Sequence, residues 1–298
     1  MRANLNRSLH SLRLLRRLAR WAQHTLLHGS LRGAPVFFAN SFPKSGTHLL
    51  TQVMSGFTRL GPAVDSGLPA VVTFDGFTGR KRALSEILVD LDRFQPGDIG
   101  YGHLHDFPEV MQRLSSDGWC AYFILRDPRD VVVSHVHYVA EMAPNHIHHR
   151  YYHEQLATFD ERLTASIQGV PAEALSRAAG VSVPEPLPDI NARFAPFTGW
   201  LDCPQVLALR YEDLVRDRRA ALERVLDHAV QRGFPLRLDR PAARQILEDS
   251  IDPQRSPTFR SGKTGGWKAA FTPQHTALFN RLAGDLLARL GYPSDTQE

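Results

Sequence analysis

Short apolar runs alternate along this chain with longer segments in which apolar residues recur every three or four positions. The apolar runs predict β-strands, and the periodic segments predict amphipathic helices. The predicted strands are residues 36–39, 98–103, 119–125 and 206–209, and the predicted helices are residues 47–54, 106–116, 129–139, a stretch from about 216, and 273–290. This alternation predicts an α/β fold: a single domain over residues 34–298, with a central parallel β-sheet flanked by helices.

The strand predicted at 119–125 is apolar throughout, as expected for a central parallel strand that helices cover on both faces. Gly291, directly after the last predicted helix, is typical of a glycine C-cap. Residues 140–170 are rich in histidine and predict a helical segment. Residues 171–190 are rich in Pro, Ala and Ser and predict a surface connection.

Residues 1–33 differ from the rest of the chain in both periodicity and charge. Leucine and alanine recur there at helical spacing, and the segment contains seven arginines and no acidic residue. The pattern predicts a basic amphipathic helix that lacks the roughly 20 apolar residues of a membrane span. Two interpretations stay open: peripheral contact with an anionic lipid surface, or packing against the domain or a second subunit.

The net charge of the chain is +4, and it is positive only because of the arginines in this N-terminal segment. The remaining residues include 28 basic and 31 acidic side chains, a net charge of −3, so we expect no nucleic-acid binding by the domain. The two cysteines, Cys120 and Cys203, form no CxxC pair and lie in or beside apolar runs. They predict buried free thiols and a reducing, cytoplasmic compartment.

A turn with the sequence Pro43-Lys44-Ser45-Gly46-Thr47 joins the first predicted strand to the first predicted helix. The backbone N–H groups of such a turn, together with a helix N-terminus, favour an anion. Hydroxyl groups at positions 45 and 47 and the charge of Lys44 add to this site. The nucleotide loop GxxxxGK[ST] is absent because the lysine here precedes the glycine, which disfavours a kinase or ATPase.

A second motif follows the apolar strand at 119–125. Arg126 stands where that strand ends, and Ser134 lies eight residues later in the predicted helix. Both are therefore expected at the carboxyl edge of the sheet, where parallel α/β folds bind ligands. An arginine fork and a hydroxyl suit a terminal phosphate, and an ion pair between Arg126 and a neighbouring aspartate is the alternative.

A third motif, at residues 258–268, combines three glycines with polar residues and carries Phe259 and Trp267 near its ends. Glycines let a backbone approach a ligand closely. The alternative interpretation is a simple flexible loop.

In this order, the three motifs resemble those of the PAPS-dependent sulfotransferases, where PAPS is 3′-phosphoadenosine 5′-phosphosulfate. Residues 43–47 are similar to the family's 5′-phosphosulfate loop, residues 126–134 to its 3′-phosphate strand and helix, and residues 259–268 to its C-terminal RKGxxGxWK loop. The YEDL sequence at 211–214 resembles a segment whose tyrosine lies near the adenine. Gly102-His103-Leu104 resembles the stretch that carries the catalytic histidine. The resemblance spans about residues 35–290 and implies a P-loop-like sulfotransferase fold.

The resemblance implies transfer of a sulfuryl group from PAPS to a hydroxyl or amine of an acceptor, with 3′-phosphoadenosine 5′-phosphate (PAP) as product and no metal ion. It implies that His103 is the base and that Lys44 stabilises the leaving phosphate. His105, two residues on, is the alternative base. The residues implied to bind the donor are Lys44, Ser45, Gly46, Thr47, His48, Arg126, Ser134, Tyr211, Arg260, Ser261 and Gly262.

The chain departs from the family pattern at three positions. Ser261 replaces the lysine of RKG, Leu49 replaces a tryptophan that stacks on adenine in many members, and Gly266 replaces a common aspartate. These departures affect the analogy for the acceptor more than that for the donor. Two other functions stay open: a P-loop-type nucleotide phosphotransferase, and a catalytically silent nucleotide-binding or scaffold protein.

No motif specifies the acceptor. Residues 60–97 and 140–195 are expected to build its pocket. His135 and His137 are candidates for the lining because their helix begins at the nucleotide site. Histidine is a common zinc ligand, but no cysteine or HExxH pattern accompanies the histidines between 135 and 153, so we expect no metal site.

Overall fold

A parallel β-sheet forms the centre of the computed structural model, which describes residues 17–27, 29–256 and 262–293. The strand order is β2-β6-β1-β7-β8, and β3 also pairs with β6. Every neighbouring pair in this sheet is parallel. The strands are β1 (Val36–Ser41), β2 (Val64–Asp65), β3 (Val71–Val72), β6 (Asp98–His103), β7 (Trp119–Leu125) and β8 (Val206–Arg210). The predicted parallel α/β fold and its four predicted strands are confirmed.

The two central strands, β1 and β7, are buried at every position, which explains why β7 and the first four residues of β1 are apolar. Successive side chains of a strand point to opposite faces of a sheet. Phe37 and Ala39 accordingly join one core cluster, and Val36 and Phe38 join the other. Helices must therefore cover both faces.

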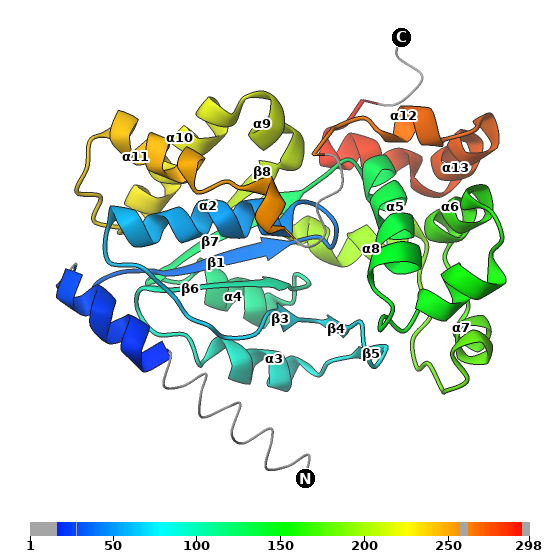
Figure 1. The fold of residues 1–298 in the computed structure, drawn as a ribbon, viewed down its shortest axis with the longest axis horizontal. Helices are drawn as coiled ribbons and strands as arrows, with labels where there is room; N and C mark the ends of the chain where they lie inside the picture. Colours follow the sequence, from blue (N-terminus) through cyan, green and yellow to red (C-terminus); the bar gives the residue numbers. More distant parts are fainter. Residues whose placement is uncertain (1–16, 28, 257–261, 294–298) are drawn as a thin grey trace.

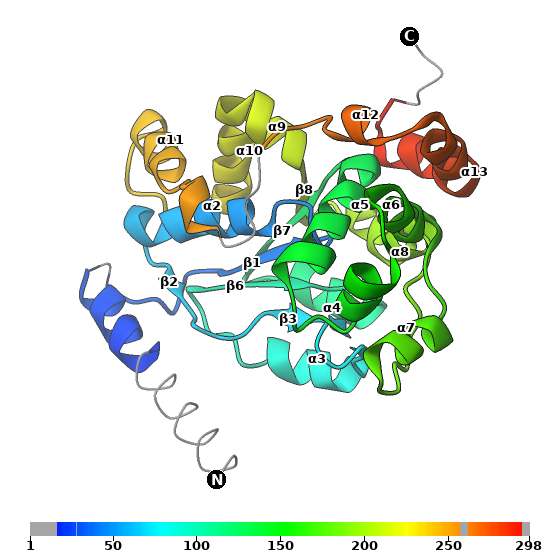
Figure 2. The same ribbon diagram turned by 45° about the vertical axis from the view of Figure 1, so that its right-hand side comes forward.

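One face of the sheet is covered by α2 and by three later helices, as Figures 1 and 2 both show. These helices are α2 (Thr47–Leu60), α9 (Tyr211–Arg216), α10 (Arg218–Gln231) and α11 (Arg240–Asp249). The opposite face packs against α3 (Leu84–Leu91), α4 (Pro108–Ser115), α5 (Pro128–His137), α6 (Phe159–Gln168), α7 (Ala172–Ala179), α8 (Ile190–Phe194) and α13 (Pro273–Leu290). The short α12 (Trp267–Ala270) precedes α13.

Residues 140–190 differ from what the sequence predicted. The histidine-rich segment is not one helix: two π-helical turns, Tyr138–Met142 and Tyr151–Gln155, flank an irregular stretch before α6 begins. The supposed surface connection contains α7, whose buried Leu175 holds it to the core. Its alanines favour a helix more than its flanking prolines disfavour one. The C-cap at Gly291 is confirmed, with φ 70°.

Several further elements were not predicted from the sequence, among them the shortest ones and the helices α3, α9 and α11. Strands β2 and β3 have two residues each, and a separate antiparallel hairpin pairs β4 (Phe74–Asp75) with β5 (Arg80–Lys81). Two 3₁₀ segments, Ala195–Asp202 and Pro253–Arg255, join later elements. Both cysteines are buried and free, as predicted, and burial raises the pKa of Cys120 to about 12, so its thiol is inert.

The described part of the N-terminal segment is a helix over residues 17–27. It lies near the beginning of β1, at the opposite end of the molecule from α5 and α13 (Figures 1 and 2). Arg17 pairs with the buried Asp98, and Arg20 contacts Asp65 at 2.7 Å. Leu18 and Leu26 are 65% and 87% exposed, so this helix docks through arginines and turns leucines outward.

Within the described ranges, no helix combines the length and the apolar character that crossing a bilayer requires.

Candidate functional site

Four strands end side by side at the carboxyl edge of the sheet, and each delivers part of one site. Strand β6 ends at His103, β1 leads into the turn at 42–46, β7 leads into Arg126, and β8 leads into Tyr211. The pairing register puts these ends together, because Ser41 lies opposite Ile124 and Leu125 lies opposite Arg210. The four fully described motifs therefore converge, as expected for ligand binding at such an edge; they are residues 43–47, 102–104, 126–134 and 211–214.

The turn between β1 and α2 has an unusual backbone. Gly46 has φ 99° and Lys44 has φ 69°, the one positive φ of a non-glycine residue in the described ranges. Such a conformation costs a lysine on the order of 1 kcal/mol, a strain that is common at ligand-binding sites. Gly46 precedes the first residue of α2, so the free N–H groups of the helix open toward this turn.

Gly46→Ala is expected to abolish donor binding and to destabilise the fold. A Cβ atom at this position would lie 2.6 Å from Cδ2 of Tyr211 and 3.3 Å from Cδ1 of Ile124, besides straining the backbone. The matched control is Gly33→Ala, because Gly33 has open space and no positive φ. Thermal unfolding and PAP titration of both variants measure the effect. Equal affinities in the two variants would rule out this turn as the anion site.

Lys44 is a largely buried cation that lacks a carboxylate partner among the described residues. Its Nζ lies 3.9 Å from the centroid of the Tyr138 ring. Burial, and then the charge of Arg126, lower the pKa of Lys44 to about 8. Two cations held close together without an intervening acid produce a positive potential, which is what an anionic ligand needs.

His103 is held in a single tautomer by the end of β1. Its Nδ1 lies 3.0 Å from the carbonyl oxygen of Ser41, and because a carbonyl only accepts, Nδ1 donates. Nε2 is therefore left with a lone pair. Burial lowers the pKa of His103, and the nearby Lys44 and His48 lower it further, so the ring is neutral near pH 7. A neutral imidazole with a free Nε2 is suited to act as a base.

His105, the alternative base, has different surroundings. Its ring packs against Phe197 at 4.8 Å and Phe107 at 5.7 Å, and the cation that lowers its pKa is Lys81 rather than Lys44. Of the two candidate bases, His103 is therefore the one whose pKa is affected by the charge of Lys44.

Arg126 connects the end of β7 to the glycine-rich loop. Its Nη2 donates to the carbonyl of Lys263 at 2.9 Å and lies 3.3 Å from Oδ2 of Asp130. Its guanidinium also lies 4.6 Å from the centroid of Tyr211, which itself packs on Gly46. The alternative interpretation of Arg126 was an ion pair with a neighbouring aspartate, and this pair does form with Asp130. Nε of Arg126 is nevertheless buried and has no hydrogen-bond partner.

Asp130 holds the glycine-rich loop beside the site. Its carboxylate accepts hydrogen bonds from the backbone N–H groups of Gly265 and Trp267, at 2.8 and 2.9 Å. Trp267 in turn packs on the guanidinium of Arg129 at 4.0 Å. Gly262, at φ 62°, belongs to the same loop. Arg260 and Ser261 lie outside the described residues, so their predicted roles stay predictions.

The remaining predicted donor-site residues lie in or next to the turn and on α5. The hydroxyl of Ser45 is buried and has no partner, whereas that of Thr47 lies 2.8 Å from the hydroxyl of Ser41. His48 lies in the first turn of α2, where burial and Lys44 lower its pKa. Ser134 lies in the last turn of α5, which ends at His137. A hydroxyl that is buried without a partner is unusual and indicates a ligand or water at that point.

Three residues that support the site were not recognised in the sequence. Ser41 fixes His103, Asp130 fixes the glycine-rich loop, and Tyr138 lies under Lys44. A signal existed only for Asp130, which belongs to the Arg126 motif. The other two contacts depend on how β1, β6 and the end of α5 meet in space.

The histidine-rich region splits into separate environments. His135 is turned inward, with Nδ1 3.0 Å from the hydroxyl of Ser166, whereas His137 contacts Glu141 on the surface at 3.1 Å. Among the side chains that the structure describes, no three His, Cys, Asp or Glu residues gather as metal ligands do.

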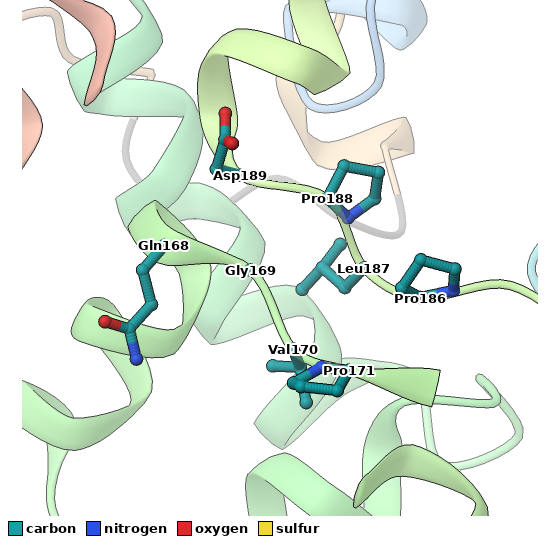
Figure 3. A pocket seen from close by; sticks show the side chains of 8 residues that line it. All are labelled: Gln168, Gly169, Val170, Pro171, Pro186, Leu187, Pro188 and Asp189. Carbon is teal, nitrogen blue, oxygen red and sulfur yellow. The ribbon is translucent and has the colours of Figure 1, made fainter. Parts of the chain in front are cut away.

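A surface pocket lies apart from the sheet edge, where the segments 168–171 and 186–189 run antiparallel (Figure 3). Its lining consists mainly of backbone and of Pro171, Pro186 and Pro188, and its single carboxylate, Asp189, caps α8. It offers none of the cationic groups that an anionic donor needs.

Neither a family model nor a curated protein matches the sequence. Solved structures match the fold. The mouse sulfotransferase SULT7A1 complexed with PAP is 19% identical at a TM-score of 0.52, and the match covers 86% of this chain and 84% of that one. Retinol dehydratase with androsterone and inactive cofactor PAP is 16% identical at a TM-score of 0.53, covering 90% and 85%. Its complex with retinol and PAP has the same identity and TM-score, covering 85% and 82%. The chain has the sulfotransferase fold.

Proposed function

We propose that this chain is a PAPS-dependent sulfotransferase, which transfers a sulfuryl group from PAPS to a hydroxyl or amine of an acceptor. The observation that carries this proposal is the meeting of Lys44, Arg126 and His103 at one sheet edge. There, the Lys44 ammonium, which has no carboxylate partner among the described residues, and the Arg126 guanidinium, which pairs with Asp130, lie beside a neutral histidine with a free Nε2. That combination matches a doubly phosphorylated donor and a base for the acceptor proton.

In this proposal the donor lies across the ends of β1, β7 and β8. The turn at 44–48 binds the 5′-phosphosulfate through backbone N–H groups, the Ser45 hydroxyl and the Lys44 ammonium. Arg126, Ser134, Arg260 and Gly262 bind the 3′-phosphate, with Ser261 in the same loop. Tyr211 borders the adenine. Support comes from the unpartnered Ser45 Oγ and Arg126 Nε, both of which a phosphate oxygen would satisfy.

The chemical step is an in-line displacement at sulfur. The acceptor oxygen or nitrogen attacks the sulfur, and its proton passes to Nε2 of His103. The bond between sulfur and the oxygen bridging to the 5′-phosphate breaks, and PAP leaves. Lys44 stabilises the negative charge that develops on this bridging oxygen, where a fixed charge contributes most to catalysis. No step of this scheme uses a metal ion.

The rate of transfer is expected to follow a bell-shaped pH profile in kcat/KM. The reaction needs neutral His103 and protonated Lys44. Because burial lowers the pKa of His103 below 6.5, the acid limb should lie below pH 6.5, and the Lys44 pKa of about 8 should produce the alkaline limb. Lys44→Arg should move the alkaline limb beyond pH 9, because an arginine stays charged there. An unmoved limb in that variant would contradict the role of Lys44.

Transfer itself is tested with PAPS labelled in its sulfuryl group and a pool of hydroxyl and amine acceptors. We expect labelled ester or amide product, and PAP, in the absence of Mg²⁺. ATP with Mg²⁺ serves as the control. Phosphoryl transfer from ATP would favour the nucleotide phosphotransferase, and donor binding without any product would favour the silent nucleotide-binding protein.

The acceptor is proposed to be a small molecule with a hydroxyl group. Retinol dehydratase has been crystallised with androsterone and with retinol, which are both alcohols, beside PAP. For this chain, residues 60–97 and 140–195 are proposed to build the acceptor pocket. The cytoplasm is the proposed compartment, because both cysteines are free.

Peripheral contact of residues 1–33 with anionic lipid is a separate proposal. The exposed Leu18, Leu26 and Leu27 support it, because the arginine contacts to the domain leave these leucines in solvent. Sedimentation with vesicles containing phosphatidylserine tests it. Serine at all three leucine positions should abolish any binding, and equal sedimentation of this variant would refute lipid contact through this face.

A further inference from the structure

Buried polar atoms without hydrogen-bond partners gather at a second place in the described part of the chain. Two of them, Ser45 Oγ and Arg126 Nε, belong to the donor site. Four others are Nδ1 and Nε2 of His148, the hydroxyl of Tyr152 and Nε of Arg193. Well over nine in ten such atoms are normally partnered in proteins. His148 is 3% exposed and Tyr152 is 0% exposed, so bulk solvent cannot compensate them.

These three side chains form one cluster. Tyr152 lies one helical turn after His148, since its N–H donates to the His148 carbonyl at 3.2 Å. The Tyr152 ring lies 5.4 Å from that of His135, whose Nδ1 is 3.0 Å from the Ser166 hydroxyl. Arg193 donates through Nη2 to the carbonyl of Ser166. Helix α8 thus brings a guanidinium to the Ser166 carbonyl, and the second π-helical turn brings a phenol beside His135, which contacts the Ser166 hydroxyl.

The cluster carries a positive charge that no direct ion pair among the described residues neutralises, although the nearby charge of Asp189 raises the pKa of Arg193. Burial lowers the pKa of Arg193 only to about 10, so its guanidinium stays charged at neutral pH. No carboxylate of the described residues forms an ion pair with it. Burial, and to a smaller extent the charge of Arg193, lower the pKa of both His148 and His135, which are therefore neutral. A buried cation among neutral hydrogen-bonding groups is costly unless an anion joins it.

The cluster lies close to the proposed transfer site. Lys44 contacts the Tyr138 ring at 3.9 Å, the Tyr138 ring lies 6.0 Å from that of His146, and His146 lies 4.8 Å from His148. The two π-helical turns flank this stretch, and wide turns of this kind are frequent at functional sites. The Phe74 ring, 6.0 Å from His148, adds an apolar wall.

We propose that Arg193, Tyr152 and His148 bind a carboxylate of the acceptor, so that the substrate is a hydroxy acid whose hydroxyl group reaches Lys44 and His103. This inference rests on the proposed function. Two parallel N–H donors of an arginine match the two oxygens of a carboxylate, and the Tyr152 O–H supplies a third donor. A neutral ester would leave the buried guanidinium without an anionic partner. A site whose buried polar groups are left unpaired by an analogue discriminates strongly against that analogue, so the acid should bind much more tightly than its ester.

The test uses matched acids and esters of increasing length. The probes are 4-hydroxybenzoate, 4-hydroxyphenylacetate and 3-(4-hydroxyphenyl)propanoate, each beside its methyl ester, titrated calorimetrically into protein saturated with PAP. At least one acid should bind about tenfold or more tightly than its ester. Arg193→Met should remove this preference, and Tyr152→Phe should reduce it. Arg281→Met, on an arginine exposed on α13 and outside the proposed acceptor pocket, is the matched control and should keep it.

Titration of PAP alone into the same variants separates the two proposals. PAP binding that is equal in wild type and Arg193→Met, together with equal affinities for every acid and its ester, would overturn the carboxylate subsite and leave the sulfotransferase proposal standing. Absence of PAP binding in the wild type would remove the proposed function itself. A preference for acids that persists in Arg193→Met would also overturn the assignment.

Discussion

Lys44→Ala is expected to lower the rate of sulfuryl transfer by about 10²–10³-fold while the protein remains folded. Removal of one group that stabilises developing charge in a transition state typically has an effect of this size. Lys44 is placed for that role because it is buried, strained and free of any described carboxylate partner. Its loss also removes a desolvated cation, so the unfolding temperature should not fall.

The effect is measured as initial rates of PAP formation from PAPS with an accepted substrate. Arg281→Ala is the matched control, since Arg281 is a cation exposed on α13, outside the proposed acceptor pocket. A Lys44→Ala enzyme within about threefold of wild type would contradict the proposed mechanism, since that difference is below 1 kcal/mol.

The fold is expected to lose most of its stability between pH 6.5 and pH 5. Burial lowers the pKa of four histidines far below 6.5: His105, His146 and His228 to about 4, and His148 to about 3. Below pH 6.5 the unfolded chain binds protons that the folded chain does not, so the free energy of unfolding falls. At pH 5.5 each histidine lowers it by about 1 kcal/mol, and together by about 4–6 kcal/mol. That is a large part of a typical domain's stability.

Urea unfolding at pH 7.5, 6.5 and 5.5 measures this loss. His228→Gln provides a check away from the site, because His228 Nε2 faces the carbonyl of Ala121 at 3.0 Å and an amide donor can replace it. The variant should lose about 1 kcal/mol less than wild type between pH 6.5 and 5.5. Stability that does not change down to pH 5 would mean that these histidines are solvated or already protonated in the native state.

The sequence was sufficient to predict that the proposed donor-site residues meet at one edge of the sheet. Arg126 and Tyr211 directly follow their strands and Lys44 lies three residues after β1, and in a parallel sheet the ends of such strands meet at one edge. Strand periodicity therefore placed three motifs together, although they are up to about 170 residues apart.

Contacts made across elements could not be predicted in this way. The hydrogen bond from His103 to the Ser41 carbonyl depends on the register of β1 and β6, and the Lys44–Tyr138 contact depends on a π-helical turn. No residue pattern predicts a single wide turn. The Arg193 cluster likewise joins residues from three separate segments, and an arginine in a short helix would ordinarily be assigned to the surface.

Calorimetric titration with PAP, with ADP plus Mg²⁺ as control, tests the central claim most directly. We expect micromolar binding that requires the 3′-phosphate, needs no metal ion, and weakens at least about tenfold in Arg126→Ala, because that side chain makes charge-assisted contacts to the phosphate. No binding of PAP, or equal binding of ADP with Mg²⁺, would contradict the assignment of the sheet edge as a PAPS site.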